Sequence, residues 1–427
     1  MHSSSHGRQQ SSDREYLHSR NAQAQSARRP APSTQRPPQR TATQQRTSHR
    51  KKKMKLLSVG LGIDMPFLIL VLVLLAIGIL MMFSASYPYA YAQEKDSYFY
   101  LKRQLLFAIV GVAAMLGLSY VNYHVFFKYA KTFIIISFAI LLFVIIMPAT
   151  AGVKRWINIG PLSFQASEVS KFCVIVFMAY LATKNADKMQ YIKYSLLPGG
   201  VLFAGTALLL YFEPHFSCIV IMFLLILIML FLGGMPGKYF LWVFAAVAVI
   251  FAIALSTGIL GYAMERMDGW GTALEYQNED QWQATWQTRN SMYAIGSGGV
   301  WGLGLGNSRQ KYLYIPEPQN DFIFSVVCEE LGLIGAIAIL ILFALLVWRG
   351  IYLSQRCSDI FGKLLGCGLS AQIGLQVILN ILVITDWLPN TGISLPFFSY
   401  GGTSLVMLLA QMGVVLSVSR RSRMEKV

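Results

Sequence analysis

The chain has 427 residues, of which 55% are hydrophobic and only 13% are charged. Soluble domains usually carry about 25% charged residues, so this composition excludes an ordinary water-soluble protein and indicates a polytopic membrane protein. The formal net charge of +16 is concentrated near the N-terminus, so it does not indicate a nucleic-acid-binding surface, and no nucleic-acid partner is expected. The five cysteines are scattered through or beside apolar segments, without metal-ligand or disulfide spacing, and we interpret them as small apolar packing residues.

Residues 1–57 are predicted to form a disordered, basic cytoplasmic tail. The segment is rich in Ser, Gln, Arg and Pro, so it cannot bury enough apolar surface to offset the entropy lost on folding. A basic run at 50–55 directly precedes the first apolar segment, which places the N-terminus in the cytoplasm by the positive-inside rule. The run also suits contact with anionic lipids, which we favour over nucleic-acid binding. A secretory signal peptide is not expected, because the apolar segment is too long and begins too late.

Residues 58–427 form the predicted membrane domain, in which ten apolar segments approach the roughly 20 residues that cross a bilayer as a helix. The ten predicted helices are approximately 62–84, 101–121, 130–149, 167–184, 196–213, 216–233, 239–260, 321–348, 362–384 and 400–419. An even number places both termini in the cytoplasm, and the Lys and Arg residues of alternate loops agree. The predicted fold is therefore an all-α, multi-pass membrane protein with ten helices.

This topology predicts three substantial outer loops, at about 150–166, 261–320 and 385–399. The loop between the seventh and eighth helices is the longest, at roughly 60 residues, and loops of this length are usually functional or mobile. It contains the run GSGGVWGLGLG at 296–306, which is too rich in glycine for an ordinary helix. The run would allow close approach of the backbone to a ligand, or a re-entrant turn. It is not a Walker A motif, since no GK[ST] sequence follows Gly306.

The first outer loop and the helix after it carry the motif GVKRWINIGPLSFQASEVSKF at 152–172. Glu168 and Lys171 are three residues apart, so they share one helix face and are able to pair. Arg155 lies beside Trp156, which suits a phosphate contact at the membrane interface. Two interpretations stay open, a structural ion pair and a site that holds an anionic headgroup at the outer leaflet, and we favour the second.

The second motif, NSRQKYLYIPEPQNDFIFSVVCEELG at 307–332, leads from a polar, basic loop into an apolar helix. Asp321 lies at the junction, and Glu329 and Glu330 lie two turns further along. Ionisable groups at membrane depth are usually functional or paired, so this stretch is the predicted functional centre. The third motif, NTGISLPFFSYGGTSLVMLLA at 390–410, combines a proline, an aromatic cluster and paired glycines. Taken alone it is typical of an aromatic belt and of close helix packing.

Together the three motifs resemble the signatures of the SEDS family (shape, elongation, division and sporulation), which includes FtsW, RodA and SpoVE, over roughly residues 60–420. The resemblance implies a ten-helix polymerase of peptidoglycan glycan strands in the bacterial plasma membrane. Its substrate would be lipid II, a disaccharide-peptide on undecaprenyl pyrophosphate, and its partner a class B penicillin-binding protein, which is a transpeptidase. The resemblance places the family's essential acidic residue at Asp321 and its functional charged positions at Arg155, Glu168 and Lys171.

The sequence departs from the family pattern at three places, one of which is Asn320, directly before Asp321, where the family often has Thr. Glu213-Pro214-His215 stands where the family often has an acidic residue or Gln followed by Pro-Asp, so any role of that aspartate is in doubt. Ala166-Ser167-Glu168 replaces the usual Pro-Ser-Glu but keeps the carboxylate.

The expected reaction joins the 4-hydroxyl of one GlcNAc to C1 of a MurNAc whose leaving group is a lipid pyrophosphate, with inversion at C1. Asp321 is the predicted general base. The predicted substrate-binding residues are the cations Arg155, Lys171, Arg309 and Lys311, together with Glu168, Glu329, Glu330 and Ser399. The cations would stabilise the pyrophosphate, and Glu329 and Glu330 would shape the cavity or pair with buried cations. No cofactor is implied beyond a possible divalent cation, Mg²⁺ or Mn²⁺.

Two other functions stay open, a lipid II flippase and a scaffold that only activates a partner. Glycosyl transfer is favoured because Asp321 lies in an outer loop, whereas a flippase should place its charges near the membrane midplane. The extended basic tail favours a division member of the family, acting at the septum with other division proteins, over an elongation or sporulation paralogue.

Overall fold

The structure is a computed structural model that describes residues 62–147, 155–159, 162–256, 270–275 and 279–424. The predicted tail at 1–57 and its boundary with the membrane domain lie outside these residues, so both stay predictions. Parts of the first and second outer loops also lie outside them.

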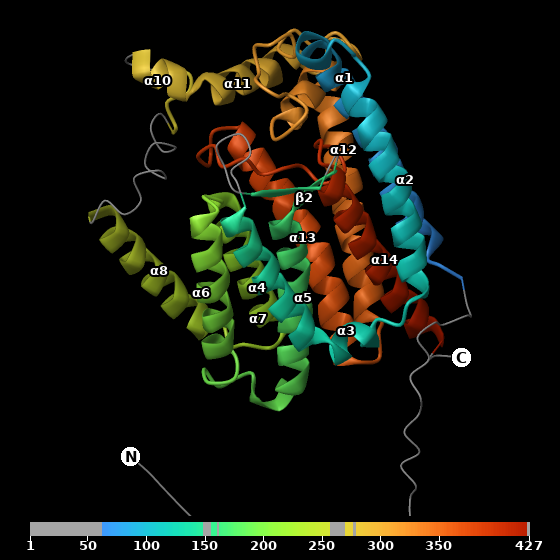
Figure 1. Cartoon of the computed structure of the whole chain (residues 1–427), viewed down its shortest axis with the longest axis vertical. Coiled ribbons are helices and arrows are strands. Elements are labelled where there is room, and N and C mark those ends of the chain that lie inside the picture. The colour runs from blue at the N-terminus through green and yellow to red at the C-terminus, as the bar shows by residue number, and fades with distance from the viewer. Residues whose placement is uncertain (1–61, 148–154, 160–161, 257–269, 276–278, 425–427) are drawn as a thin grey trace, which may run out of the picture. The chain divides into compact units, whose positions relative to one another are not determined.

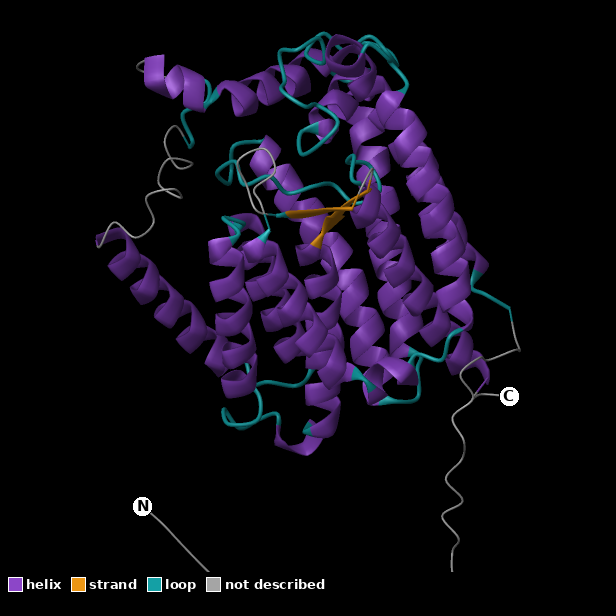
Figure 2. Cartoon of the chain, viewed as in Figure 1, coloured by secondary structure: helices purple, strands orange, loops and turns teal. Residues whose placement is uncertain are grey.

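The described part of the chain consists almost entirely of helices (Figures 1 and 2). The long helices, one for each predicted segment, are α1 (Met65–Glu94), α2 (Phe99–Tyr120), α4 (Ala130–Ile146), α5 (Ala166–Lys184), α6 (Leu196–Phe212), α7 (Phe216–Leu232), α8 (Lys238–Ser256), α12 (Ile323–Gln355), α13 (Ile360–Ile384) and α14 (Gly402–Met424). Six of them, α1, α2, α5, α12, α13 and α14, are long and apolar enough to cross a membrane, while α4, α6, α7 and α8 are shorter apolar helices. The predicted all-α, polytopic membrane fold is confirmed, and crossing by all ten helices stays a prediction.

Burial separates the central helices of the bundle from the outer ones. In α5, α13 and α14, 78%, 67% and 72% of the apolar stretch is buried, against 22% in α2. An apolar side chain that faces outward on a membrane helix meets lipid instead of water. The buried polar residues of α5, α13 and α14, among them Glu168, Lys171 and Asn380, therefore lie in the interior of the bundle, away from lipid.

Two short strands precede α5 and were not expected from the sequence, which predicted a loop there. β1 (Trp156–Ile159) and β2 (Leu162–Gln165) pair antiparallel (Figure 2). The main-chain N–H of Gln165 donates to the hydroxyl of Thr403 at 3.3 Å, so the hairpin is fastened to the first turn of α14. The first and third motifs thus meet at this end of the bundle.

The long second outer loop contains two helices, α10 (Glu279–Ala284) and α11 (Trp286–Gly298), at the end of the bundle opposite α3 (His124–Lys128) (Figure 1). Gly296–Gly298 belong to the last turn of α11, which corrects the expectation that this glycine run is not helical. The run does bring backbones close together, but its neighbour is α12 rather than a ligand. A Cβ at Gly298 would overlap the carbonyl oxygen of Cys328.

α12 is interrupted at Gly332, where its backbone bonds to the glycine run. Gly332 has φ 66° and ψ −171°, which is not helical and is readily adopted only by glycine. The N–H of Leu333 donates to the carbonyl of Gly299 at 2.9 Å, and the N–H of Leu303 donates to the carbonyl of Glu329 at 2.9 Å. The backbone groups that the interruption releases therefore find partners in the run, as a membrane protein requires.

Candidate active site

A cavity of about 480 Å³ lies between the hairpin, the outer-loop residues 392–401 and the adjoining ends of α5, α7 and α14. Five of the predicted site residues line it, namely Arg155, Glu168, Lys171, Asp321 and Ser399. The three motifs, which are far apart in the sequence, therefore share one cavity. Their roles toward a substrate stay predictions.

Glu168 and Lys171 form the ion pair that their spacing predicts. Lys171 Nζ lies 2.7 Å from Glu168 Oε1, and the two side chains are 3% and 11% exposed respectively. Glu168 lies in the first turn of α5, where the helix dipole favours a negative charge. A buried ion pair is weak evidence for a stabilising role, because desolvation offsets the attraction. Its position in the cavity wall therefore favours a role toward a ligand.

Arg155 lies at the start of the hairpin and contacts the turn between α6 and α7. Its Nη2 donates to the carbonyl of Pro214, and its Nε donates to the carbonyl of Glu213 at 3.4 Å. His215, which the family pattern would have as Asp, lines the cavity beside this turn. The unusual triplet therefore forms part of the cavity wall and holds the arginine.

Asp321 lies two residues before α12 and is not its N-cap residue. The N-cap position belongs to Phe322, and no side chain bonds there. The main-chain carbonyl of Asp321 accepts a hydrogen bond from Asn380 Nδ2 at 2.7 Å, so α13 holds the backbone of this turn. The side chain is half-buried and lines the cavity.

The third motif holds the same turn from the other side. Ser399 Oγ donates to the carbonyl of Asn320 at 2.8 Å and accepts from the N–H of Leu395 at 2.7 Å. The N–H of Tyr400 donates to the carbonyl of Gln319 at 2.8 Å. Ser399 thus lines the cavity while its hydroxyl fixes the chain next to Asp321, and a substrate contact by Ser399 stays a prediction.

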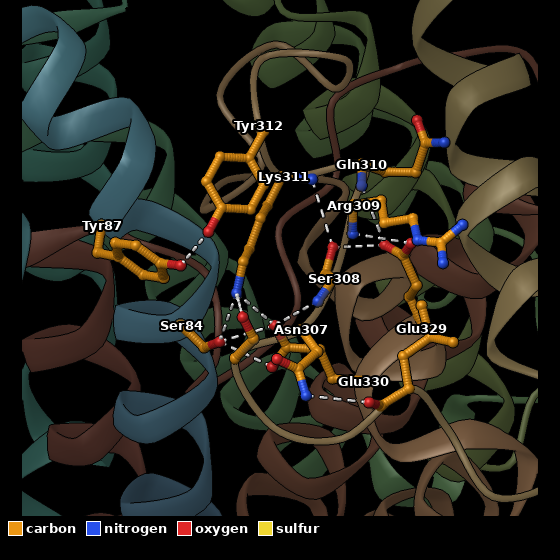
Figure 3. A network of polar contacts seen from close by, with 12 residues as sticks. Ser84, Tyr87, Asn307, Ser308, Arg309, Gln310, Lys311, Tyr312, Glu329 and Glu330 are labelled. Carbon is orange, nitrogen blue, oxygen red and sulfur yellow. Dashed lines mark hydrogen bonds and ion pairs between the residues drawn. The ribbon is translucent and has the colours of Figure 1, made fainter.

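Four predicted site residues, Arg309, Lys311, Glu329 and Glu330, do not line this cavity. Figure 3 shows Lys311 directed toward Ser84 and Glu330, and its Nζ lies 2.7 Å from Glu330 Oε1 with both side chains fully buried. Ser84 Oγ donates to both carboxylate oxygens of Glu330, at 2.8 and 2.7 Å. Lys311 therefore neutralises Glu330 instead of facing the cavity, which disfavours its predicted contact with pyrophosphate.

Glu329 is enclosed by the loop that precedes Lys311 (Figure 3). It accepts hydrogen bonds from the hydroxyl of Ser308, from the N–H of Arg309 at 3.0 Å and from the N–H of Gln310 at 3.3 Å. Glu330 is thus ion-paired and Glu329 is hydrogen-bonded, which agrees with the expectation that ionisable groups in a membrane segment have partners. The network, which we call the loop anchor (Ser84, Ser308, Lys311, Glu329 and Glu330), ties the loop to α1 and α12.

Ser217 and Gln376 are among the uncharged cavity residues that sequence reasoning missed. The signal that was available is the spacing of Gln372, Gln376 and Asn380, three amides four residues apart in an apolar helix. The ligand sets that hold metal ions are groups of side chains such as His, Cys, Asp and Glu. Among the residues that the structure describes, no three or more His, Cys, Asp or Glu side chains are grouped so as to hold an ion.

Comparisons with known proteins identify the family. The family model described as "Cell cycle protein", which covers FtsW, RodA and SpoVE, matches residues 65–424. The chain is 37% identical over 335 residues to stage V sporulation protein E of Bacillus subtilis, covering 77% of this chain and 89% of that one. It is 36% identical over 331 residues to a protein of Geobacter sp. (strain M18) named probable peptidoglycan glycosyltransferase FtsW, with the same coverage.

A solved structure, described as "Structural coordination of polymerization and crosslinking by a peptidoglycan synthase complex", contains a chain with a TM-score of 0.70 and 25% identity to this one. The match covers 85% of this chain and 99% of that chain. The sequence motifs, the helical membrane fold and the matched residues agree, and the chain belongs to the SEDS family of FtsW, RodA and SpoVE.

Proposed function

We propose that this chain is a peptidoglycan glycosyltransferase that polymerises lipid II into glycan strands, with Asp321 as the general base. The observation that carries the proposal is the shared cavity, in which the carboxylate of Asp321 faces the same space as Arg155 and the Glu168–Lys171 pair. The names of relatives, which include probable peptidoglycan glycosyltransferases, support the same activity.

The proposed step is a direct displacement. The carboxylate of Asp321 takes the proton of the acceptor 4-hydroxyl, which must lie within about 2.6–3.2 Å. The acceptor oxygen forms a bond to C1 of the donor MurNAc while the bond from C1 to the pyrophosphate oxygen breaks, so the configuration at C1 inverts. The leaving group departs as undecaprenyl pyrophosphate. Arg155 would stabilise its negative charge, and Mg²⁺ or Mn²⁺ would supply further positive charge if a divalent cation takes part.

The partner and the cellular role are proposed from the description of a similar structure and from the N-terminal sequence, and not from the geometry of the cavity. A class B penicillin-binding protein is the proposed transpeptidase partner, supported by the solved complex that is described as coordinating polymerization and crosslinking. Work at the septum with other division proteins is proposed from the basic N-terminal tail. Identities of 37% to a sporulation protein and 36% to an FtsW protein favour neither subfamily.

The flippase alternative predicts charges near the membrane midplane along a transport path. The charged residues that line the cavity instead lie in outer loops or within the first two turns of α5. Glu329 and Glu330, which do not line the cavity, are held in the loop anchor. This arrangement supports chemistry at the outer surface over transport.

The test is polymerisation of lipid II by the purified full chain, with and without its cognate penicillin-binding protein. Asp321→Asn keeps the size of the side chain but cannot accept the proton, so activity should fall by about 10²-fold or more. Folding and partner binding should not change, because Asn and Asp have nearly the same volume and are comparable at helix starts. Glu275→Gln, an exposed outer-loop carboxylate away from the cavity, is the matched control and should keep full activity. Near-normal polymerisation by a folded Asp321→Asn protein would revive the flippase and scaffold alternatives.

A further inference from the structure

Three amide side chains, Gln372, Gln376 and Asn380, follow one another at intervals of four along α13. Residues four apart lie on the same helix face, so the three form what we call the amide column. All three are buried, with exposed fractions of 1%, 5% and 0%. Polar side chains in the interior of a membrane bundle usually have a function or a specific partner.

The top of the amide column touches the proposed catalytic turn. Asn380 Nδ2 donates to the carbonyl of Asp321 and to that of Ile393, both at 2.7 Å. Gln376 lies one turn closer to the centre of the bundle, about 6 Å along the helix axis. Gln376 and Asp321 line the same cavity, so a group bound at Gln376 would share that cavity with Asp321, about one helical turn from the point where α13 contacts the backbone of Asp321.

Gln376 lines the cavity, and its amide has no hydrogen-bond partner among the residues that the structure describes. Gln372, one turn deeper, is in the same condition, since neither its Oε1 nor its Nε2 has a partner in the described part of the chain. Buried amides are nearly always hydrogen-bonded, to protein, water or a ligand. Gln376 faces the cavity and can meet a ligand, whereas Gln372 lies below it and can meet only water.

The charge of the surrounding wall indicates what kind of group would bind. Glu168 and Lys171, two charged residues of the cavity wall, neutralise each other at 2.7 Å. Ser217 adds a neutral hydroxyl. A pyrophosphate needs net positive charge, so it is a poor match for this part of the cavity. A primary amide both donates and accepts, and it therefore pairs well with an acetamido group or with sugar hydroxyls.

We propose that Gln376 is a substrate-binding residue that hydrogen-bonds an acetamido or hydroxyl group of the N-acetylated sugar headgroup, with Gln372 hydrated beneath it. This proposal rests on the proposed function and specifies which part of the substrate enters deepest. The sugar then lies on the amide column below Asp321, and the pyrophosphate lies toward Arg155.

The test compares two buried glutamines that differ in position. Gln376→Met keeps the length of the side chain and removes the amide. Gln411→Met on α14 is the matched control, because Gln411 is 1% exposed, also has no amide partner in the described residues, and does not line the cavity. The full-length protein in nanodiscs is titrated with lipid II and, separately, with undecaprenyl pyrophosphate, which has the same anchor and no sugar.

Gln376→Met should weaken lipid II binding by about 10-fold, the usual effect of losing a hydrogen bond in a site built for one, and leave undecaprenyl pyrophosphate binding within about 2-fold. Gln411→Met should change neither. Unchanged lipid II binding by Gln376→Met, or equal weakening for both lipids, would overturn the proposal. Where Gln376→Met fails to fold, Gln376→Asn replaces it, and its shorter amide should give an intermediate loss that is again confined to lipid II.

These results are distinct from a failure of the proposed function. A wild-type protein that binds lipid II but forms no glycan, even with its partner, would refute the glycosyltransferase while the binding comparison still decides the role of Gln376. A wild-type protein that binds no lipid II would refute both.

Discussion

Glu168 and Lys171 place opposite charges 2.7 Å apart in the wall of the cavity, and both are largely shielded from solvent. If the pair only neutralises itself, the double exchange Glu168→Lys with Lys171→Glu should restore both folding and activity. If it orients a charged or polar headgroup, the exchange reverses the field that the substrate meets. We expect the folded yield to recover and the rate of lipid II polymerisation to stay at least about 10-fold below wild type.

The measurement is polymerisation by each single variant and by the double variant, alongside thermal unfolding in detergent. Both single variants should unfold at lower temperature, because each leaves an uncompensated buried charge. Full activity of the double variant would identify a plain structural ion pair.

The site residues that the sequence could predict are charged residues that lie in or beside apolar segments. Asp321 and Glu168 stand out because carboxylates beside apolar segments are rare. Lys311 stands out for the same reason, yet its pairing with Glu330 depends on how the loop folds back onto α12, which no local pattern encodes. Gln376 was missed because a neutral amide barely disturbs the hydropathy of a membrane helix, and only the cavity gives it meaning.

At the scale of single elements, the contact between α11 and α12 depends on glycine at one position and not at another. A Cβ at Gly298 would overlap the carbonyl of Cys328, whereas a Cβ at Gly296, in the same helix, would meet nothing within 4 Å. Gly298→Ala should therefore destabilise the protein by about 1–3 kcal/mol through overpacking. Gly296→Ala should be neutral or stabilising by up to about 1 kcal/mol, since alanine favours the helix.

Thermal unfolding of both variants in the same detergent checks this prediction. Equal melting temperatures for Gly298→Ala and Gly296→Ala would show that the two helices do not pack closely at this point. The polymerisation rate of Gly298→Ala reports separately whether the loop before Asp321 needs that packing.

Asp359 begins α13 at the end of the bundle opposite the cavity. Its Oδ2 accepts from the N–H of Gly362 at 2.9 Å, and its Oδ1 accepts from the hydroxyl of Tyr123. Burial acts to raise the pKa of Asp359, but hydrogen bonds from Tyr123, Gly362 and Cys357 and the nearby His124 outweigh it, so the pKa lies below the ordinary 3.8. A lowered pKa means that the carboxylate stabilises the fold above about pH 3.8 and loses this effect as the pH falls further.

Asp359→Ala should therefore lower the free energy of unfolding by about 1 kcal/mol between pH 5 and 8, the usual cost of losing an N-cap. Denaturant unfolding across that range is the measurement, and the loss should not decrease toward pH 5. Asp187→Ala, in the exposed turn Ala186–Lys188, is the control and should change little. A loss that disappears at pH 5 would contradict the lowered pKa.

The helices that the sequence could predict are those that coincide with a long apolar run. Each of the ten long helices coincides with a run of this kind, because its length and hydropathy are local properties. The hairpin at 156–165 was not predictable, since its strands have four residues each and depend on Thr403 for part of their bonding. The interruption at Gly332 lies inside a continuous apolar run, and only the bonds to residues 299–304 reveal it.

At the scale of the whole membrane domain, the cavity and the basic residues of the predicted cytoplasmic loops lie at opposite ends of the helices. The cavity, α10 and α11 lie at one end, and α3 lies at the other (Figure 1). Lys128, Lys184 and Arg356, which alternate-loop charge assigns to the cytoplasm, belong to the end that holds α3. The substrate cavity would then open on the outer side, where lipid-linked precursors are polymerised.

The topology is testable because all five cysteines are buried, so cysteines introduced at exposed sites are labelled against a low background. Tyr314, in the loop predicted to be outside, is 53% exposed, and Lys188, in a loop predicted to be cytoplasmic, is also exposed. In intact cells a membrane-impermeant maleimide should label Tyr314→Cys and not Lys188→Cys, and after permeabilisation it should label both. The positive-inside rule gives the reason, since Lys and Arg in short loops resist translocation. Labelling of Lys188→Cys alone in intact cells would show that the orientation is the opposite of the predicted one. The cavity would then lie on the cytoplasmic side, which would refute polymerisation at the outer surface.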